Sequence, residues 1–337
     1  MKNKTVQAGE KKDFRTLNKR SGGYLIKARM KKLFVSVIRG LLLFGLCFMI
    51  IQPMLTRFGT SLMAERDLYD STIVLLPRNP TLDNYRIVFE LTNFPKSMFN
   101  TLWTSLLVSL FQVASCTLVG YGFARYDFPL KNFWFGCVIA TIVIPPQTIA
   151  TALYIAFQKF DIFGIFQAFT GKPLNLHGSL TPYLLMSSTC MGLKNGLYVY
   201  MLRQYFRGVP RSLEDAAYVD GCGTFHTFWR IMLPGAMPTI ASCFLFSFVW
   251  QWTDLFYTRN FLATASRPIF STELSTIVSR MSRYFSSDAS KPIIVPVGRQ
   301  QQLISIGVLV CCLPLIILYV FTQRVFVKSI TMSGIKE

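Results

Sequence analysis

One short polar stretch, which lies between two long apolar segments, carries the residues best suited to contact another molecule. A carboxylate in the first turn of a helix is stabilised by the helix dipole, and Ser212 could cap such a helix. Gly221 allows a turn with positive φ, and a second helix would then run to a stop where the next apolar segment begins. The adjacent alanines would let another protein surface approach closely. The residues of interest are Glu214, Asp215, Ala216, Ala217, Asp220, Gly221, Leu233 and Pro234.

Other kinds of site find little support in the sequence. Eight cysteines and two histidines occur without a Cys-x-x-Cys pair, which argues against a zinc site or a disulfide framework. Gly171-Lys172-Pro173 is a near miss to a phosphate-binding loop, but Pro173 stands where Ser or Thr is required. No metal and no nucleotide are therefore expected on this chain. No nucleophile with a base and an orienting group is visible either, so we expect no enzyme activity.

The composition is that of a protein with several membrane spans. Of 337 residues, 52% are apolar and only 15% are charged, which is too apolar for an ordinary soluble protein. A formal charge of +19 would suggest nucleic acid in a soluble protein. In a membrane protein, it instead indicates cytoplasmic loops held next to anionic lipid. We therefore expect membrane lipid as a partner, and we do not expect nucleic acid.

Six long apolar segments predict six membrane-spanning helices, and the basic N-terminal tail with this even number of spans places both ends in the cytoplasm. A basic tail over residues 1–32 should be partly disordered, and the loop over 56–97 has no excess of cations, which places it outside. The loop over 259–299 holds six cations against Glu273 and Asp288 and runs against this topology. The expected spans cover residues 34–55, 97–124, 133–158, 180–206, 235–252 and 303–321.

Several residues within or beside the spans could line a transport path. Pro145-Pro146 should bend its helix, and with Gln147 it would form either a path wall or a buried kink. Lys194, near the middle of a span, either contributes to the path or packs where Gly192 and Gly196 break the helix. The last candidates are Gln251 and Asp254, which lie in Trp250-Gln251-Trp252-Thr253-Asp254. That cluster could stack on a sugar, although an interfacial tryptophan belt is the favoured interpretation.

The central stretch resembles the "EAA" loop of ABC-importer permeases. The match consists of Asp215-Ala216-Ala217, three residues, Gly221, nine residues, and Ile231-x-Leu233-Pro234, with Asp215 where the family usually has Glu. The flanking residues from Leu202 to Pro210, together with Asp220-Gly221, are similar to the carbohydrate branch, and in particular to the second maltose-importer permease. The resemblance implies an all-α polytopic membrane protein with the type I importer fold, in which this loop is a cytoplasmic coupling helix that docks on an ATPase subunit.

The resemblance also implies an assembly in the bacterial plasma membrane. Its expected partners are a second related permease, two cytoplasmic ATPase subunits that bind ATP and Mg, and an extracytoplasmic solute-binding protein that delivers a sugar. The expected parts of this chain are a basic tail (1–32), a first helix with an outer loop (33–97), a permease core (98–328) with the coupling loop at 207–234, and a C-terminal tail (329–337).

Three other functions stay open from the sequence. An importer for an oligopeptide, polyamine or phosphate would keep the same fold. A membrane-embedded transferase would need an acidic cluster near the membrane, and only Asp254 comes near this requirement. In a non-transporting scaffold, the central stretch would be a simple interaction helix.

Overall fold

The computed structural model describes residues 24–70, 72–73, 75–262, 267–286 and 293–334. Most of the expected N-terminal tail, Asp288 and the last three residues lie outside these ranges. The chain divides into two compact units, Met1–Pro80 and Thr81–Glu337. The boundary at Pro80 falls within the segment 33–97 that the sequence analysis treats as the first helix and its outer loop.

The first unit is built on one long apolar helix, α2 (Tyr24–Leu62), followed by the short helix η1 (Asp67–Tyr69). Its apolar part, Lys27–Leu62, has 36 residues with a mean hydropathy of 2.4, and about 20 residues are enough to cross a membrane. After the helix, the Asp67 carboxylate accepts hydrogen bonds from the backbone N–H of Asn79 at 2.8 Å and from its side-chain amide at 3.1 Å. These bonds close the segment after α2 into a compact loop.

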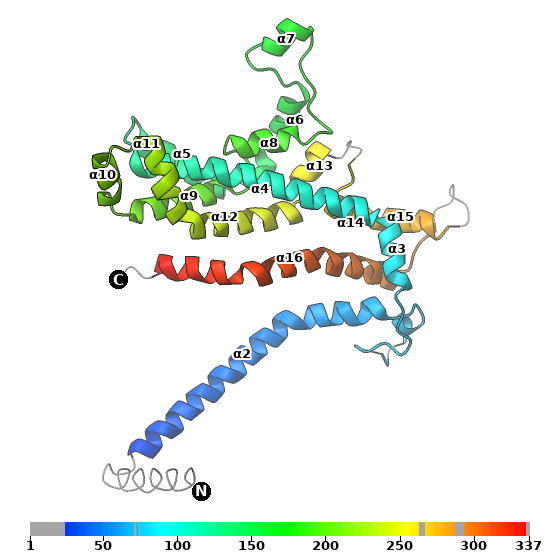
Figure 1. Ribbon diagram of the computed structural model, residues 1–337. Helices are drawn as coiled ribbons and strands as arrows, with labels where there is room; N and C mark the ends of the chain where they lie inside the picture. The colour runs from blue at the N-terminus through cyan, green and yellow to red at the C-terminus, as the bar shows by residue number, and fades with distance from the viewer. Residues whose placement is uncertain (1–23, 71, 74, 263–266, 287–292, 335–337) are drawn as a thin grey trace. The chain divides into compact units, whose positions relative to one another are not determined.

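The regular secondary structure in the described residues of the second unit is helical, apart from one isolated β-bridge between Phe160 and Leu174 (Figure 1). Its elements in chain order are α3 (Asp83–Leu91), α4 (Phe94–Arg125), α5 (Lys131–Val143), η2 (Pro146–Ile149), α6 (Ala150–Gln158), α7 (Ile165–Thr170), α8 (Thr181–Ser188), α9 (Asn195–Gly208), α10 (Ser212–Val219), α11 (Thr224–Thr227), η3 (Phe228–Met232), α12 (Leu233–Thr253), α13 (Phe256–Leu262), α14 (Phe270–Ser275), α15 (Ile277–Tyr284) and α16 (Val297–Gly334).

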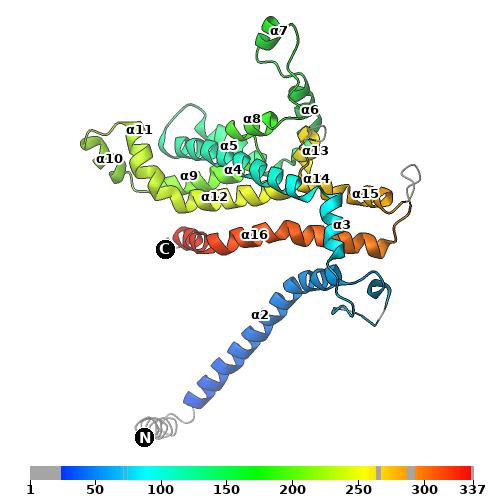
Figure 2. The ribbon, with the colours of Figure 1, turned by 45° about the vertical axis from the view of Figure 1, so that its right-hand side comes forward.

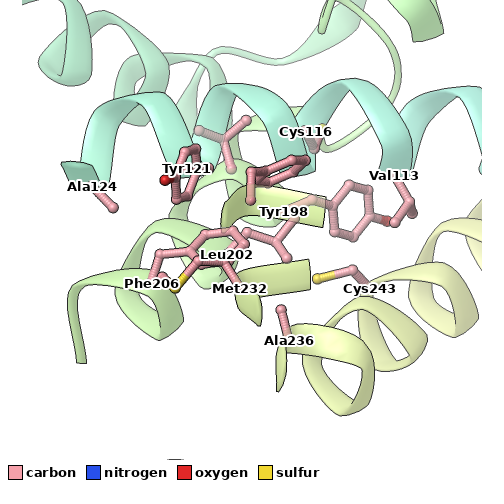
Figure 3. Close-up of a cluster of buried hydrophobic side chains, with 12 residues drawn as sticks. Val113, Cys116, Tyr121, Ala124, Tyr198, Leu202, Phe206, Met232, Ala236 and Cys243 are labelled. Carbon is pink, nitrogen blue, oxygen red and sulfur yellow. The ribbon is translucent and has the colours of Figure 1, made fainter. Parts of the chain in front are cut away.

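Helix α4 is the central element of this unit, with α8, α9 and α12 packed against it and α16 along α12 (Figure 2). A Cβ atom at Gly120 would lie only 2.9 Å from the Cβ of Leu202, so the backbones of α4 and α9 approach as closely as small residues permit. Tyr121, Tyr198 and Phe206 fill the space between these helices and α12 (Figure 3). The three helices therefore share one core.

Four helices of the described residues are long and apolar enough to span a membrane, and one bent pair makes a possible fifth span. The pair consists of residues 131–143 and 146–158, which meet at 101°. The predicted effect of Pro145-Pro146 is thus confirmed, because two successive prolines remove two backbone donors and exclude a straight helix.

The span expected over residues 180–206 is interrupted. Helix α8 ends at Ser188 and α9 begins at Asn195, and between them Cys190 and Lys194 have positive φ values of 56° and 62°. Neither helix alone has the length to cross a membrane. Gly196 lies inside α9, where its hydrogen lets α5 approach: a Cβ there would meet the Val138 carbonyl oxygen at 2.6 Å.

Two local expectations around the central stretch were wrong. Ser212 is the first residue of α10, and Arg211 is its N-cap. The helix also does not stop at Leu233-Pro234 but continues from Thr224 to Thr253. Phe228–Met232 forms a π-helical turn, and this wider turn accommodates Pro234, which has no N–H to bond to the preceding turn.

Candidate functional site

The candidate site is α10 together with the turn that follows it, at the end of the second unit where α9 ends and α11 begins (Figure 1). Gly221 has φ = 81°, as predicted, and the turn is closed by the Cys222 N–H, which donates to the Ala217 carbonyl at 2.9 Å. A Cβ at Gly221 would meet nothing within 4 Å. Glycine is therefore required there for its backbone conformation and not for space.

Glu214 fixes α10 to the last turn of α4. Its carboxylate forms an ion pair with Arg125 Nε at 3.0 Å, with the two side chains only 9% and 7% exposed, and it accepts a hydrogen bond from the Tyr121 hydroxyl at 2.9 Å. Arg125 Nη2 also donates to the Val209 carbonyl at 2.8 Å, in the link before α10. Burial and the nearby Glu214 charge also raise the pKa of Tyr218, one turn further along α10. Each charge of the pair has a partner, which a buried ion pair requires.

The predicted docking residues divide into two groups. Glu214 and Ala217 are buried against the rest of the unit, and Leu233 is half-buried on α12. The remaining predicted residues are exposed: Asp215, Ala216, Asp220, Gly221 and Pro234. The available face thus carries two carboxylates and one alanine, while the other alanine serves internal packing.

The structure adds apolar residues to this face that the sequence analysis did not single out. Leu213 and Val219 of α10 are 49% and 87% exposed, and Phe225 and Trp229 beyond the turn are 76% and 51% exposed. The ring centres of Phe225 and Trp229 lie 5.9 Å apart. Large apolar side chains exposed beside carboxylates are typical of a surface that binds another protein. The sequence shows that these four residues are apolar, but it does not show that all four are exposed near one another.

The candidate path residues near the double proline lie on the surface of the unit. Pro145 and Gln147 are exposed and Pro146 is half-buried. Lys194 is half-buried, with its Nζ 5.2 Å from the centre of the Trp250 ring. Gln251 is half-buried as well. The geometry brings Lys194 and Trp250 together, and it does not join them to the double proline.

Asp254 has a structural role. It is 8% exposed and accepts hydrogen bonds from the Tyr183 hydroxyl at 2.7 Å and the Thr258 N–H at 3.0 Å, which fixes the start of α13 to α8. Trp252 is likewise buried, with its Nε1 donating to the Cys311 carbonyl at 3.1 Å. The interpretation as an interfacial belt therefore fits Trp250, which is 44% exposed, and is wrong for Trp252.

Gln112 is a buried polar residue that the sequence analysis missed. Its amide nitrogen donates to the Leu193 carbonyl at 2.5 Å and to the Asn195 side chain, and its oxygen accepts from the Ser247 hydroxyl at 2.5 Å. One α4 side chain thus joins the break between α8 and α9 to α12. The sequence signal for this role was a glutamine within an uncharged span, because a buried side-chain amide needs hydrogen-bond partners.

Within the described residues, no group of three or more His, Cys, Asp or Glu side chains is placed to hold a metal ion.

Comparison with known proteins identifies the family. Residues 117–332, more than half of the chain, match the model of the binding-protein-dependent transport system inner membrane component. The chain belongs to this family. It is the membrane component of an ABC transport system, and the matched segment contains the end of α4 from residue 117 onward, the candidate docking helix and most of α16.

Individual relatives agree with the family match over most of the chain. An arabinooligosaccharide transport system permease of Halalkalibacterium halodurans is 25% identical over 91% of this chain and 100% of its own length. A maltodextrin transport system permease of Bacillus subtilis is 26% identical over 76% of this chain and 81% of its own. A crystal structure of a bacterial ABC transporter that imports alginate has the same fold, with a TM-score of 0.63, 15% identity, and coverage of 86% of this chain and 96% of the other.

Proposed function

We propose that this permease imports a sugar or oligosaccharide, and that α10 couples its movement to a separate ATPase subunit. The observation that carries the proposal is the division of α10 into two faces. The inner face is joined to α4 by the Glu214–Arg125 pair, while Asp215, Ala216 and Asp220 point away from the unit. A helix with one fixed face and one free face can pass a displacement from a partner into the membrane helices.

The proposed assembly supplies the parts that this chain is not expected to provide. A second related permease would complete the transport path, and two cytoplasmic ATPase subunits would bind ATP and Mg. An extracytoplasmic solute-binding protein would deliver the sugar. Closure of the ATPase pair would then swing the helices between inward-open and outward-open arrangements. In this scheme the permease lies in the bacterial plasma membrane with both termini in the cytoplasm and breaks no covalent bond.

The substrate class rests on the relatives. The permeases of H. halodurans and B. subtilis carry arabinooligosaccharide and maltodextrin in their names, and both are carbohydrates. Import of an oligopeptide or polyamine is the alternative, and it predicts the same docking surface with a different stimulating solute.

The test compares Ala216→Arg with wild type in membranes that contain the partner subunits. Ala216 is exposed, so the variant should fold and insert, but its bulk and charge should prevent close contact. We expect co-purification of the ATPase subunit to fall at least about tenfold, and solute-stimulated ATP hydrolysis in proteoliposomes to fall with it. The matched control is Ser279→Arg, an exposed small residue on α15.

Two results would contradict the proposal. If Ala216→Arg retains the ATPase and hydrolyses ATP as the wild type does, α10 is not the docking element. If wild type brings down no ATPase, the scaffold function becomes the better description. Stimulation by a peptide or polyamine, but by no sugar, would overturn the substrate class alone.

A further inference from the structure

A polar cavity of about 660 Å³ lies where the loop after α4 meets the start of α5 and the end of α9. Its lining includes four cationic side chains and one carboxylate: Lys131, Arg203, Arg207, Arg211 and Asp127. Arg203 and Arg207 are four residues apart and lie on one side of α9, and Arg211 is the N-cap of α10. The cavity therefore concentrates positive charge next to the candidate docking helix.

The single carboxylate is already engaged. Asp127 Oδ1 lies 3.0 Å from Lys131 Nζ, and the hydrogen bond and charge of this lysine lower the pKa of Asp127, which keeps it ionised. None of the ion pairs formed among the described residues includes Arg203, Arg207 or Arg211. Three positive charges in the cavity thus have no carboxylate within ion-pair distance in the described part of the chain.

Arg203 is held in a defined orientation. Its guanidinium carbon lies 3.8 Å from the centre of the Phe135 ring, and its Nε is buried without a hydrogen-bond partner in the described residues. Stacking on an aromatic ring fixes the plane of the guanidinium while its N–H groups remain able to donate. Planar arginines are well suited to the oxygens of a phosphate group.

The border of the cavity is apolar. Phe128, Leu130 and Phe133 line it, and these side chains are 37%, 69% and 60% exposed. Helix α5, which begins here, packs on α9 but has no fully buried residue, so part of its apolar surface remains available to lipid or to another subunit. Cations beside exposed aromatic rings at the end of a membrane helix are typical of the level of lipid headgroups.

We propose that this cavity binds the phosphate headgroup of an anionic phospholipid, with Arg203, Arg207 and Arg211 as the phosphate-binding residues. Basic pockets between membrane helices are known to accept such headgroups, and the apolar border would receive the acyl chains. The cavity includes Arg211, so a bound lipid would also fix the first turn of α10. The inference depends only on the membrane location of the chain and not on its substrate or its ATPase.

The test uses the full chain, with whichever partner subunits co-purify, delipidated in an uncharged detergent. Bound lipid is counted by native mass spectrometry during titration with phosphatidylglycerol, with zwitterionic phosphatidylethanolamine, and with inorganic phosphate as the free anion. The variant is Arg207→Gln/Arg211→Gln, in which both side chains are exposed. The control, Arg230→Gln/Arg283→Gln, removes two exposed arginines that do not line the cavity.

We expect phosphatidylglycerol to bind the wild type and the control alike, and to bind the variant roughly tenfold more weakly, since each cation near an anionic lipid adds to the affinity. Equal phosphatidylglycerol binding by variant and wild type would overturn the proposal, as would equal binding of the two lipids. Free phosphate that binds as tightly as phosphatidylglycerol would show that the ligand is a small anion. A variant that loses the ATPase but keeps the lipid would show that the cavity is a protein interface.

Discussion

At the scale of single residues, neighbouring carboxylates on α10 have opposite surroundings. Glu214 is buried in an ion pair with Arg125, whereas Asp215 is exposed. Both were predicted to meet the ATPase. The sequence could not separate them, because the rotation of a short helix is decided by a partner on another helix, here Arg125 at the end of α4.

Replacement of Glu214 should therefore act on stability, and replacement of Asp215 on docking. Glu214→Gln leaves the Arg125 charge buried without its counterion, which should destabilise the fold by roughly 3 kcal/mol. The measurement is the melting temperature of the purified chain in detergent. Asp215→Asn is the matched control and should leave the melting temperature nearly unchanged.

The pair itself can be isolated with a double variant. Glu214→Gln/Arg125→Gln removes both charges, so it should recover part of the stability lost by Glu214→Gln alone. Two independent, additive losses would show that these side chains are not coupled.

Glycine and proline gave the most reliable local predictions. A positive φ at Gly221 and a bend at Pro145-Pro146 are what the covalent structures of glycine and proline favour, and both are present. The stop predicted at Leu233-Pro234 failed because a proline within a helix can also be accommodated by a wider turn before it. The local sequence does not decide between these two outcomes.

At the scale of elements, the bend between α5 and α6 can be tested directly. Pro145→Ala/Pro146→Ala restores two backbone donors, so residues 131–158 should form a straighter helix. Spin labels at positions 136 and 154 should then move apart by roughly 10 Å, as estimated from a rise of 1.5 Å per residue. An unchanged distance would show that packing, and not proline, fixes the bend. A charge-neutral control is Thr148→Ala, beside the bend.

The interruption of the span over residues 180–206 could not be read from hydropathy. Its residues are apolar enough for a continuous helix, and the break is stabilised from outside by Gln112 on α4. The break that the two glycines near Lys194 suggested is present, and Gly192 lies within it. Gly196 lies inside α9, where it allows close packing of α5. A side chain from another helix, such as Gln112, can bond to a carbonyl group that has no hydrogen bond within its own helix, and so it decides where a helix can break.

The basic loop near the C-terminus also has an explanation at this scale. Arg280 donates to the Leu91 carbonyl at 2.8 Å and pairs with Glu273, while Arg299 is 6% exposed and donates to the Asn84 side chain at 2.6 Å. Part of the positive charge between residues 259 and 299 thus holds α15 and α16 to α3. Cations used inside the fold need not report on membrane topology, so these two arginines do not count against the expected outer location of this loop.

At the scale of the whole molecule, much apolar surface is left for other partners. The apolar window of α2 has no buried residue, and α5 has none either. Such helices need lipid or a second subunit to cover them. The hydropathy of the sequence identifies these helices, but it does not show which molecules cover them.

We expect co-expression with the proposed second permease to stabilise this chain. Burial of exposed apolar helices against a partner should raise the melting temperature in detergent by several degrees relative to the chain alone. The measurement is a thermal unfolding curve of the two preparations at equal concentration. A permease from an unrelated importer serves as the control, and an identical melting temperature with the true partner would show that lipid alone covers these surfaces.

The attachment of α10 to the end of α4 also has a mechanical consequence. Helix α4 has 32 residues and is therefore about 48 Å long. A tilt of only about 10°, imposed at the Arg125 end, would displace the opposite end by roughly 8 Å on this geometry. Because α9 packs closely against α4 at Gly120, it would move with α4. In the proposed coupling, a small displacement of α10 would therefore produce a much larger displacement at the opposite end of α4.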